Sequence, residues 1–260
     1  MRFPARLATI FRHRQVLGVL VKKDFDTRYA GSIFGVLWTQ IYPLMLMGVY
    51  TFFFTVVFKS STPHYPLFLF MGIVVFTFFS TSITLSTGSV LANGSLIANV
   101  SFPNELVTVS AVVLALIDLV TSHVIVLAGA GIYGVTPSWS WLALPPIVLL
   151  LLLFCLGLGL LLATANVYLR DVKYFVDVAV LMLMFLSPVF YAASALPSSL
   201  AWLMKVNPLA IALIAYRQAM LDHTWPNPHV WADLSVVGLT FLFLGLEVFA
   251  RGRKGFVDAL

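Results

Sequence analysis

Long charge-free segments are the feature that most limits the possible folds of this chain. Four stretches contain no Asp, Glu, Lys or Arg: residues 29–58, 60–104, 119–169 and 178–204. A membrane-crossing helix needs about 20 apolar residues, so each stretch can cross a bilayer and two can cross it twice. Charged side chains make up only 10% of the chain, against about 25% in soluble domains. A soluble enzyme or secreted domain is excluded, and we predict an all-α integral membrane protein.

Six apolar runs predict six transmembrane helices. We place them at about residues 33–58, 66–87, 106–133, 141–167, 172–191 and 230–250. The first run is too long for a signal-peptide core and lacks a cleavage pattern, so we expect it to remain as the first span. The stretch 192–228 is too long for a tight turn, but its apolar pieces are too short to cross. We expect an external re-entrant helical segment there.

The distribution of positive charge predicts the orientation, because Lys and Arg are retained on the cytoplasmic side. With six spans, twelve of the fifteen Lys and Arg residues share the side of the two termini. The other side keeps only Lys59, Lys205 and Arg217. We therefore expect both termini in the cytoplasm. The net charge of +5 then follows from topology, and we expect no nucleic-acid partner.

The sequence pattern of residues 1–30 predicts a cytoplasmic amphipathic interface helix. Basic residues alternate with apolar ones that recur at helical spacing, namely Leu7, Ile10, Phe11, Leu17, Leu20, Val21 and Phe25. Such a helix lies in the headgroup layer. It is either a topology anchor or a lateral element that also touches a cytoplasmic partner. Gly31 and Gly35 follow, at a spacing that permits close backbone approach between helices.

The cytoplasmic loop 88–105 has no Lys or Arg but contains regularly placed apolar residues. These are Leu91, Leu96, Ile97, Val100 and Phe102, followed by Pro103. The pattern predicts a short amphipathic helix that Pro103 separates from the third span. A simple connector and a docking surface are both compatible with it.

Asp118 and His123 are the ionisable residues nearest to the middle of a span. Such groups are costly in lipid, so a role in transport is the default hypothesis. We expect no basic residue at the same depth, and a proton relay needs several titratable groups. The other interpretation is that Asp118 is protonated or hydrogen-bonded and fixes helix packing.

Aromatic residues make up 14% of the chain and include 22 Phe. Most are expected to face lipid or to form an interfacial belt. A subset facing a channel would offer flat surfaces for stacking against sugar rings. The candidates are Trp38, Tyr42, Phe76, Phe79, Phe185 and Tyr191.

Motifs for catalysis and nucleotide binding are absent from the sequence. There is no G-x-x-x-x-G-K-[ST] phosphate loop, no H-E-x-x-H and no G-x-S-x-G. The single Cys155 excludes an internal disulfide or a thiolate metal cluster. We expect no catalytic, cofactor or metal site in this chain, so energy must come from a partner or an ion gradient.

Six ordered sequence blocks carry a family resemblance. The first contains Lys23-Asp24-Phe25, Arg28 to Ser32, Gly35 to Trp38 and Tyr42-Pro43-Leu44. The others are Leu96-Ile97 with Val100 to Pro103 and Glu105, then Asn166 to Val172, Ser187 to Tyr191, Asn207 to Leu209, and Tyr216-Arg217. From about Leu20 onward, the chain resembles the permease subunits of type 2 ABC exporters for O-antigen, capsule or teichoic acid.

This resemblance implies a homodimer bound to two separate ATPase subunits, which would bind ATP and Mg. It also implies that the loop helix and the N-terminal helix receive the ATPase motion, and that spans one, two and five of both copies line a channel. The re-entrant segment would gate the external mouth, and a lipid-linked polysaccharide would enter from the cytoplasmic leaflet of the membrane. Arg28 would contact the lipid's pyrophosphate or act as a structural anchor.

One departure concerns the docking loop, where relatives often carry basic residues and this chain has Ala98, Asn99 and Asn104. Apolar docking through Leu96, Ile97 and Phe102 is therefore favoured over charge pairing. Two alternatives stay open: a type 2 ABC permease for a drug or a lipid, and a gradient-driven carrier that uses Asp118 and His123.

Overall fold

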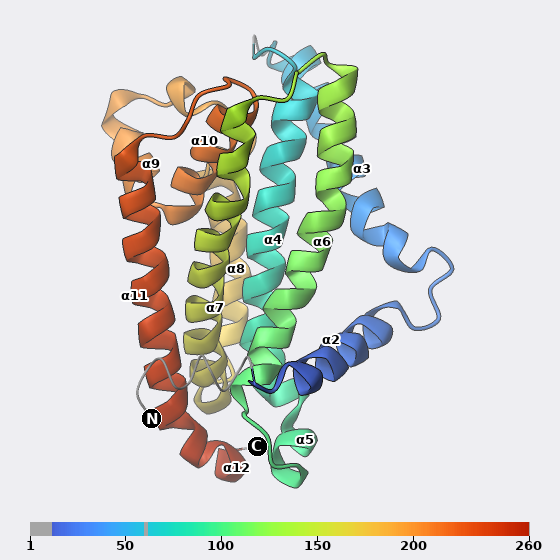
Figure 1. The fold of residues 1–260 in the computed structure, drawn as a ribbon, viewed down its shortest axis with the longest axis vertical. Helices are drawn as coiled ribbons and strands as arrows, with labels where there is room; N and C mark the ends of the chain where they lie inside the picture. The colour runs from blue at the N-terminus through green and yellow to red at the C-terminus, as the bar shows by residue number, and fades with distance from the viewer. Residues whose placement is uncertain (1–11, 60–61, 260) are drawn as a thin grey trace.

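The computed structural model describes residues 12–59 and 62–259. Within these ranges all regular secondary structure is helical, and the long helices form one bundle (Figure 1). The predicted all-α membrane fold is confirmed. Five helical segments are long and apolar enough to cross a bilayer: Gly35–Val57, Tyr65–Ala92, Glu105–Ile132, Trp139–Tyr168 and Pro228–Gly255.

One end of the bundle holds the C-terminus and is called the terminal end below. It carries α2 (Arg14–Tyr29), α5 (Gly94–Asn99), η6 (Arg253–Gly255) and α12 (Phe256–Ala259). The first span combines η1 (Gly35–Leu37), α3 (Trp38–Phe52) and the π-helical η2 (Phe53–Val57). The remaining spans are α4 (Tyr65–Ala92), α6 (Glu105–Ile132), η3 (Trp139–Ala143) with α7 (Leu144–Tyr168), and α11 (Pro228–Gly252).

The predicted fifth span, 172–191, is shorter than expected. Helix α8 (Val172–Leu186) has 15 residues and is about 22 Å long, less than the hydrocarbon thickness of about 30 Å. It ends because Pro188 disfavours helical backbone in the preceding residue, and Ser187 is extended. In Figure 1, α8 lies behind α7, and it packs on α4 and α7.

The stretch predicted to be re-entrant contains a sharply bent helix pair, a geometry that a re-entrant segment and a broken span share. After the short turns η4 (Ala193–Ala195) and η5 (Ser198–Leu200), α9 (Ala201–Val206) meets α10 (Pro208–Met220) at 94°. The Asn207 side chain accepts hydrogen bonds from the backbone N–H groups of Leu209 and Ala210, and Pro208 occupies the first helical turn. Both are helix-starting features, so α10 begins immediately after the bend.

Helix α4 occupies the centre of the bundle and packs on α3, α6, α7 and α8. Helices α7 and α11 approach closely through glycines: a Cβ on Gly245 would lie 2.2 Å from the carbonyl oxygen of Gly157. Gly31 and Gly35 make no close helix approach within the described chain, because a Cβ there would meet nothing within 4 Å. Their φ angles of +71° and +47° show that these glycines are needed for the turn.

Helix α2 lies across the terminal end of the bundle and packs on α6 (Figure 1). Leu20 is buried in a cluster with Ile97 and Leu106. Leu7, Ile10 and Phe11, which belong to the predicted amphipathic helix, lie outside the described residues. Figure 1 places α2 and α12 at the same end, opposite α9 and α10.

Candidate channel wall and cavity

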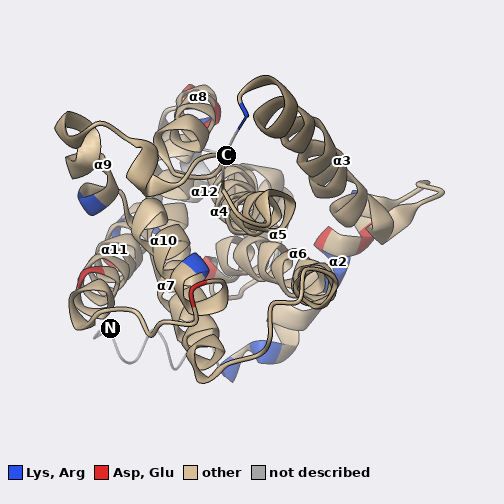
Figure 2. Cartoon of the chain, turned by 90° about the horizontal axis from the view of Figure 1, so that it is seen from above, with Lys and Arg blue, Asp and Glu red and all other residues tan. Residues whose placement is uncertain are grey.

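A cavity of about 470 Å³ lies between α3, α4 and α6, and is also lined by the end of α2 and by residues in and after α8. Seen from the α9–α10 end, α3 stands apart from the cluster formed by α4, α6, α7 and α11 (Figure 2). Within the part of the chain that the structure describes, α3 packs chiefly on α4. The first two spans therefore form opposite walls of this cavity.

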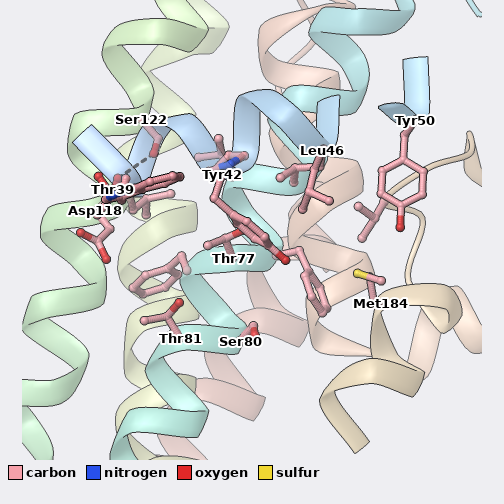
Figure 3. A pocket seen from close by; sticks show the side chains of 18 of the residues that line it. Thr39, Tyr42, Leu46, Tyr50, Thr77, Ser80, Thr81, Asp118, Ser122 and Met184 are labelled. Carbon is pink, nitrogen blue, oxygen red and sulfur yellow. Dashed lines mark hydrogen bonds between the residues drawn. The ribbon is translucent and has the colours of Figure 1, made fainter. Parts of the chain in front are cut away.

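A row of hydroxyl groups on α4 faces the cavity. Thr77, Ser80 and Thr81 are spaced so that they share one helix face. Figure 3 shows Tyr42 from α3 and Thr77 from α4 at the cavity, with Ser80 and Thr81 further along α4. None of these three α4 hydroxyls makes a hydrogen bond to a described residue, so they are available to a ligand. We did not predict this row, although hydroxyl residues at helical spacing in an apolar span were a visible signal.

The structure brings three of the six candidate aromatic residues to the cavity. Trp38 and Tyr42 lie one turn apart on α3, are 47% and 59% exposed, and line the cavity together with Phe76. Phe79 instead lies in the core, stacked on Phe154 with a centroid distance of 6.2 Å.

The two remaining candidates lie outside the cavity lining. Phe185 is exposed near the end of α8. The Tyr191 hydroxyl donates to the Phe185 carbonyl at 2.9 Å. These two residues form one local unit at the end of α8.

An ion pair closes the cavity at the end of α2. Arg28 Nη1 lies 2.7 Å from Asp118 Oδ2, and both residues line the cavity. The expectation that no basic residue reaches the depth of Asp118 is therefore wrong, because α2 brings one in from outside the spans. Burial raises the pKa of the adjacent Tyr29 phenol, and the charge of Asp118 adds to this effect. Tyr29 thus contributes a neutral hydroxyl that has no partner among the described residues.

Two further polar contacts hold α2 against the bundle. Lys23 donates to the Asn93 side chain, and Ser110 donates to Asp24 at 2.9 Å. Together with Arg28, these contacts use charged residues from one sequence block to fix α2 beside α4 and α6. A displacement of α2 would therefore act directly on the cavity wall.

His123 belongs to a different environment from Asp118. One ring nitrogen contacts the Leu119 carbonyl at 2.8 Å, and the other contacts the Tyr216 hydroxyl at 2.6 Å. Asp118 and His123 therefore have partners on different elements: Asp118 pairs with Arg28 of α2, and His123 contacts Tyr216 of α10.

Arg217 joins α10 to the rest of the bundle. It is 6% exposed and donates to the carbonyl groups of Pro188, Val189 and Phe68, with its guanidinium 3.5 Å from the centre of the Phe68 ring. Among the described residues it has no carboxylate partner. Gly72 provides the space, because a Cβ there would lie 2.3 Å from Arg217 Nη2.

Three of the sequence blocks meet at this junction. Asn207 donates to Ser187 at 2.9 Å, and the Tyr65 hydroxyl donates to the Phe190 carbonyl at 2.8 Å. The backbone after α8 is thus held by side chains from α4 and α10, while Val189 and Phe190 line the cavity. The spatial proximity of these blocks was not part of our prediction.

The predicted docking loop contains a helix, α5, whose apolar face is used internally. Ile97 is 6% exposed and packs with Val90, Leu106 and Phe256; Leu91, Leu96 and Phe102 contact the same cluster. Leu91 belongs to α4, which extends beyond its predicted end. The Ile97 side chain thus anchors α5 to the rest of this chain. Ala98, Asn99 and Val100 are exposed, whereas Pro103 is only partly exposed.

These features define a multi-pass membrane protein with a cavity of mixed polar and apolar lining, walled by its first two spans. The chain matches the family of ABC-2 type transporters over residues 15–221 and belongs to that family. The resemblance to type 2 ABC permeases is thereby confirmed.

Curated relatives are similar over nearly their whole length. The O-antigen export system permease protein RfbA of Myxococcus xanthus is 30% identical over 253 residues, covering 96% of this chain and 97% of the relative. A Klebsiella pneumoniae protein with the same description is 28% identical over 246 residues, with 94% and 95% coverage. The capsule polysaccharide export inner-membrane protein CtrC of Neisseria meningitidis is 24% identical over 272 residues, with 96% and 95% coverage.

Proposed function

We propose that this chain is the permease subunit of an ATP-driven exporter that moves a lipid-linked polysaccharide across the cytoplasmic membrane. The observation that carries the proposal is a cavity with exposed rings on α3 and unpaired hydroxyls on α4. The descriptions of the relatives as O-antigen and capsule polysaccharide export proteins support the same substrate class.

The chemistry of the cavity suits a sugar chain in transit. Trp38 and Tyr42 offer flat apolar faces to sugar rings, while Thr77, Ser80 and Thr81 can exchange hydrogen bonds with sugar hydroxyls. A neutral hydrogen bond has a modest net free energy of about 1 kcal/mol. Passage through a pore requires many contacts that are individually weak. A glycan can therefore advance by exchanging one such contact for another.

The proposed assembly contains two copies of this chain and two ATPase subunits. The cavity would be one half of a channel, completed by α3, α4 and α8 of the second copy. ATP and Mg would bind to the ATPase partner, since this sequence has no phosphate loop. The outer surface of α5 and the adjoining part of α2 would receive the ATPase.

The basic residues support an orientation with both termini in the cytoplasm. Those of α2, of the α7–α8 junction and of the C-terminal segment belong to one end of the bundle (Figure 1). Lipid-linked glycan would then approach from the cytoplasmic leaflet. The Arg28 side chain is 34% exposed while it is paired with Asp118. The ion pair fixes the orientation of the guanidinium group, and its exposed part can contact a pyrophosphate.

Replacing Trp38 and Tyr42 together by Leu tests the proposal. Each lost stacking contact removes about 1 kcal/mol, so export of long glycan should slow by about tenfold or more. The matched control replaces Phe52 and Phe53, exposed rings of the same span outside the cavity, by Leu. Export at the normal rate in the Trp38 and Tyr42 variant, with expression equal to the control, would remove these rings from the pathway.

A further inference from the structure

A second cavity lies at the opposite end of the bundle from α2 and α12. It has a volume of about 520 Å³ and is bounded by α9, α10 and the first turns of α11. Its floor is apolar and includes Met204, Ile211, Ile214 and Val230. It shares no lining residue with the cavity beside α3 and α4.

The rim of this cavity carries opposite charges that do not meet. Lys205 comes from the last turn of α9, and Asp233 comes from α11 with His229 one turn before it. Among the described residues, none of these three side chains forms an ion pair or a hydrogen bond. The Lys205 ammonium and the Asp233 carboxylate thus line the same cavity but lie too far apart to form an ion pair. Apolar surface separates them.

The cavity lies at the depth of lipid headgroups. Helix α11 has 25 residues and is about 37 Å long, which exceeds the hydrocarbon thickness of about 30 Å. A helix of this length reaches the interfacial layer, and the Trp residues beside its first turns place that end there. Trp225 and Trp231 pack on each other beside the start of α11, with ring centroids 5.9 Å apart, and Trp202 on α9 is 56% exposed. Trp residues are enriched at this depth of a bilayer.

We propose that this cavity binds a glycerophospholipid with a phosphoethanolamine headgroup. Its phosphate would contact Lys205, its ammonium group would contact Asp233, and its acyl chain would cover the apolar floor. An anionic lipid would leave Asp233 facing a phosphate without a cation, which is unfavourable. The lipid would fill the space between α9 and α11, and so brace the re-entrant segment. The proposal requires only that α11 spans a membrane, and it is independent of the transported cargo.

The test measures lipids retained by the purified full-length permease after exposure to vesicles with equal amounts of phosphatidylethanolamine and phosphatidylglycerol. Native mass spectrometry should show preferential retention of phosphatidylethanolamine by the unmodified protein. K205Q/D233N should retain about tenfold less of it, as expected for loss of about 1.4 kcal/mol. D233N alone should lose the preference over phosphatidylglycerol, because the ammonium contact is removed while Lys205 remains.

The matched control is K59Q/D222N, which removes the same two charges at exposed positions outside the cavity. It should retain lipid as the unmodified protein does. Unfolding temperatures in lipid-free detergent should be equal for all variants, since the substituted side chains have no described partners in the chain. Equal retention of both lipids by the unmodified protein, or equal loss in K205Q/D233N and the control, would overturn the proposal.

Discussion

Arg28 and Asp118 are 90 positions apart in the sequence, yet their side chains form a 2.7 Å ion pair at one end of the cavity. The contact joins α2, which lies across the terminal end of the bundle, to the middle of α6. Asp118 therefore has a fixed cationic partner, which favours a positioning role over proton transfer. The same contact links the helix proposed to sense the ATPase with the proposed substrate cavity.

Asp118→Asn should preserve most ATP-driven export. The neutral amide can still accept a hydrogen bond from Arg28, and loss of a partly exposed charge pair costs about 1 kcal/mol. The thermal unfolding temperature of the purified permease should fall slightly, while transport with the ATPase continues. Asp222→Asn is the control, since Asp222 is exposed and outside the cavity. Complete loss of transport in a correctly assembled Asp118→Asn complex would favour the gradient-driven carrier.

Gly72→Ala should destabilise the junction between α4, α10 and the backbone after α8. Its added Cβ would lie 2.3 Å from Arg217 Nη2 and 2.7 Å from the Val189 carbonyl oxygen. Overpacking of this kind costs about 1–3 kcal/mol. Gly88→Ala on the same helix is the matched control, because its Cβ would meet nothing within 4 Å. Equal unfolding temperatures for the two variants would contradict the proposed importance of Arg217 placement.

Asp substitutions at neighbouring positions of α5 should have different effects. Ile97→Asp places a charge in the buried cluster with Leu106 and Phe256, so the unfolding temperature should fall sharply. Ala98→Asp lies on the exposed side of α5, so the fold should persist while association with the ATPase weakens. Unfolding and co-purification measured on both variants separate the two effects. Undiminished ATPase binding by Ala98→Asp would exclude this surface of α5 from the docking site.

Thr77→Val together with Thr81→Val should slow glycan export without changing the fold. The two hydroxyls have no described partner in the chain, so stability should be nearly unchanged. Each lost contact with a sugar is worth about 1 kcal/mol, or about fivefold in binding. Export rates at several glycan-lipid concentrations measure the loss. Thr55→Val is the control on the first span, and an equal loss there would refute a specific function of the α4 hydroxyls.

Local sequence patterns were sufficient to locate most of the helices. Apolar runs predicted the five long spans to within a few residues, and the short apolar pieces after residue 192 predicted helices where the bent pair α9 and α10 lies. The prediction for α8 was too long because hydropathy continues past Leu186, whereas Pro188 stops the helix. The cavity was predicted only in part, through Trp38, Tyr42 and Phe76.

Hydropathy, charge distribution and the order of the motif blocks are properties of the sequence itself, and they established an all-α membrane protein of the type 2 ABC permease class. The pairing of Arg28 with Asp118, the contacts of Arg217 and the inward face of Ile97 depended on tertiary structure. Periodicity reports which residues share a helix face, but the direction of that face is set by packing against segments distant in the sequence. In an apolar bundle most helix faces have a similar residue composition. Only the folded arrangement therefore distinguishes the cavity wall from the lipid-facing and core surfaces.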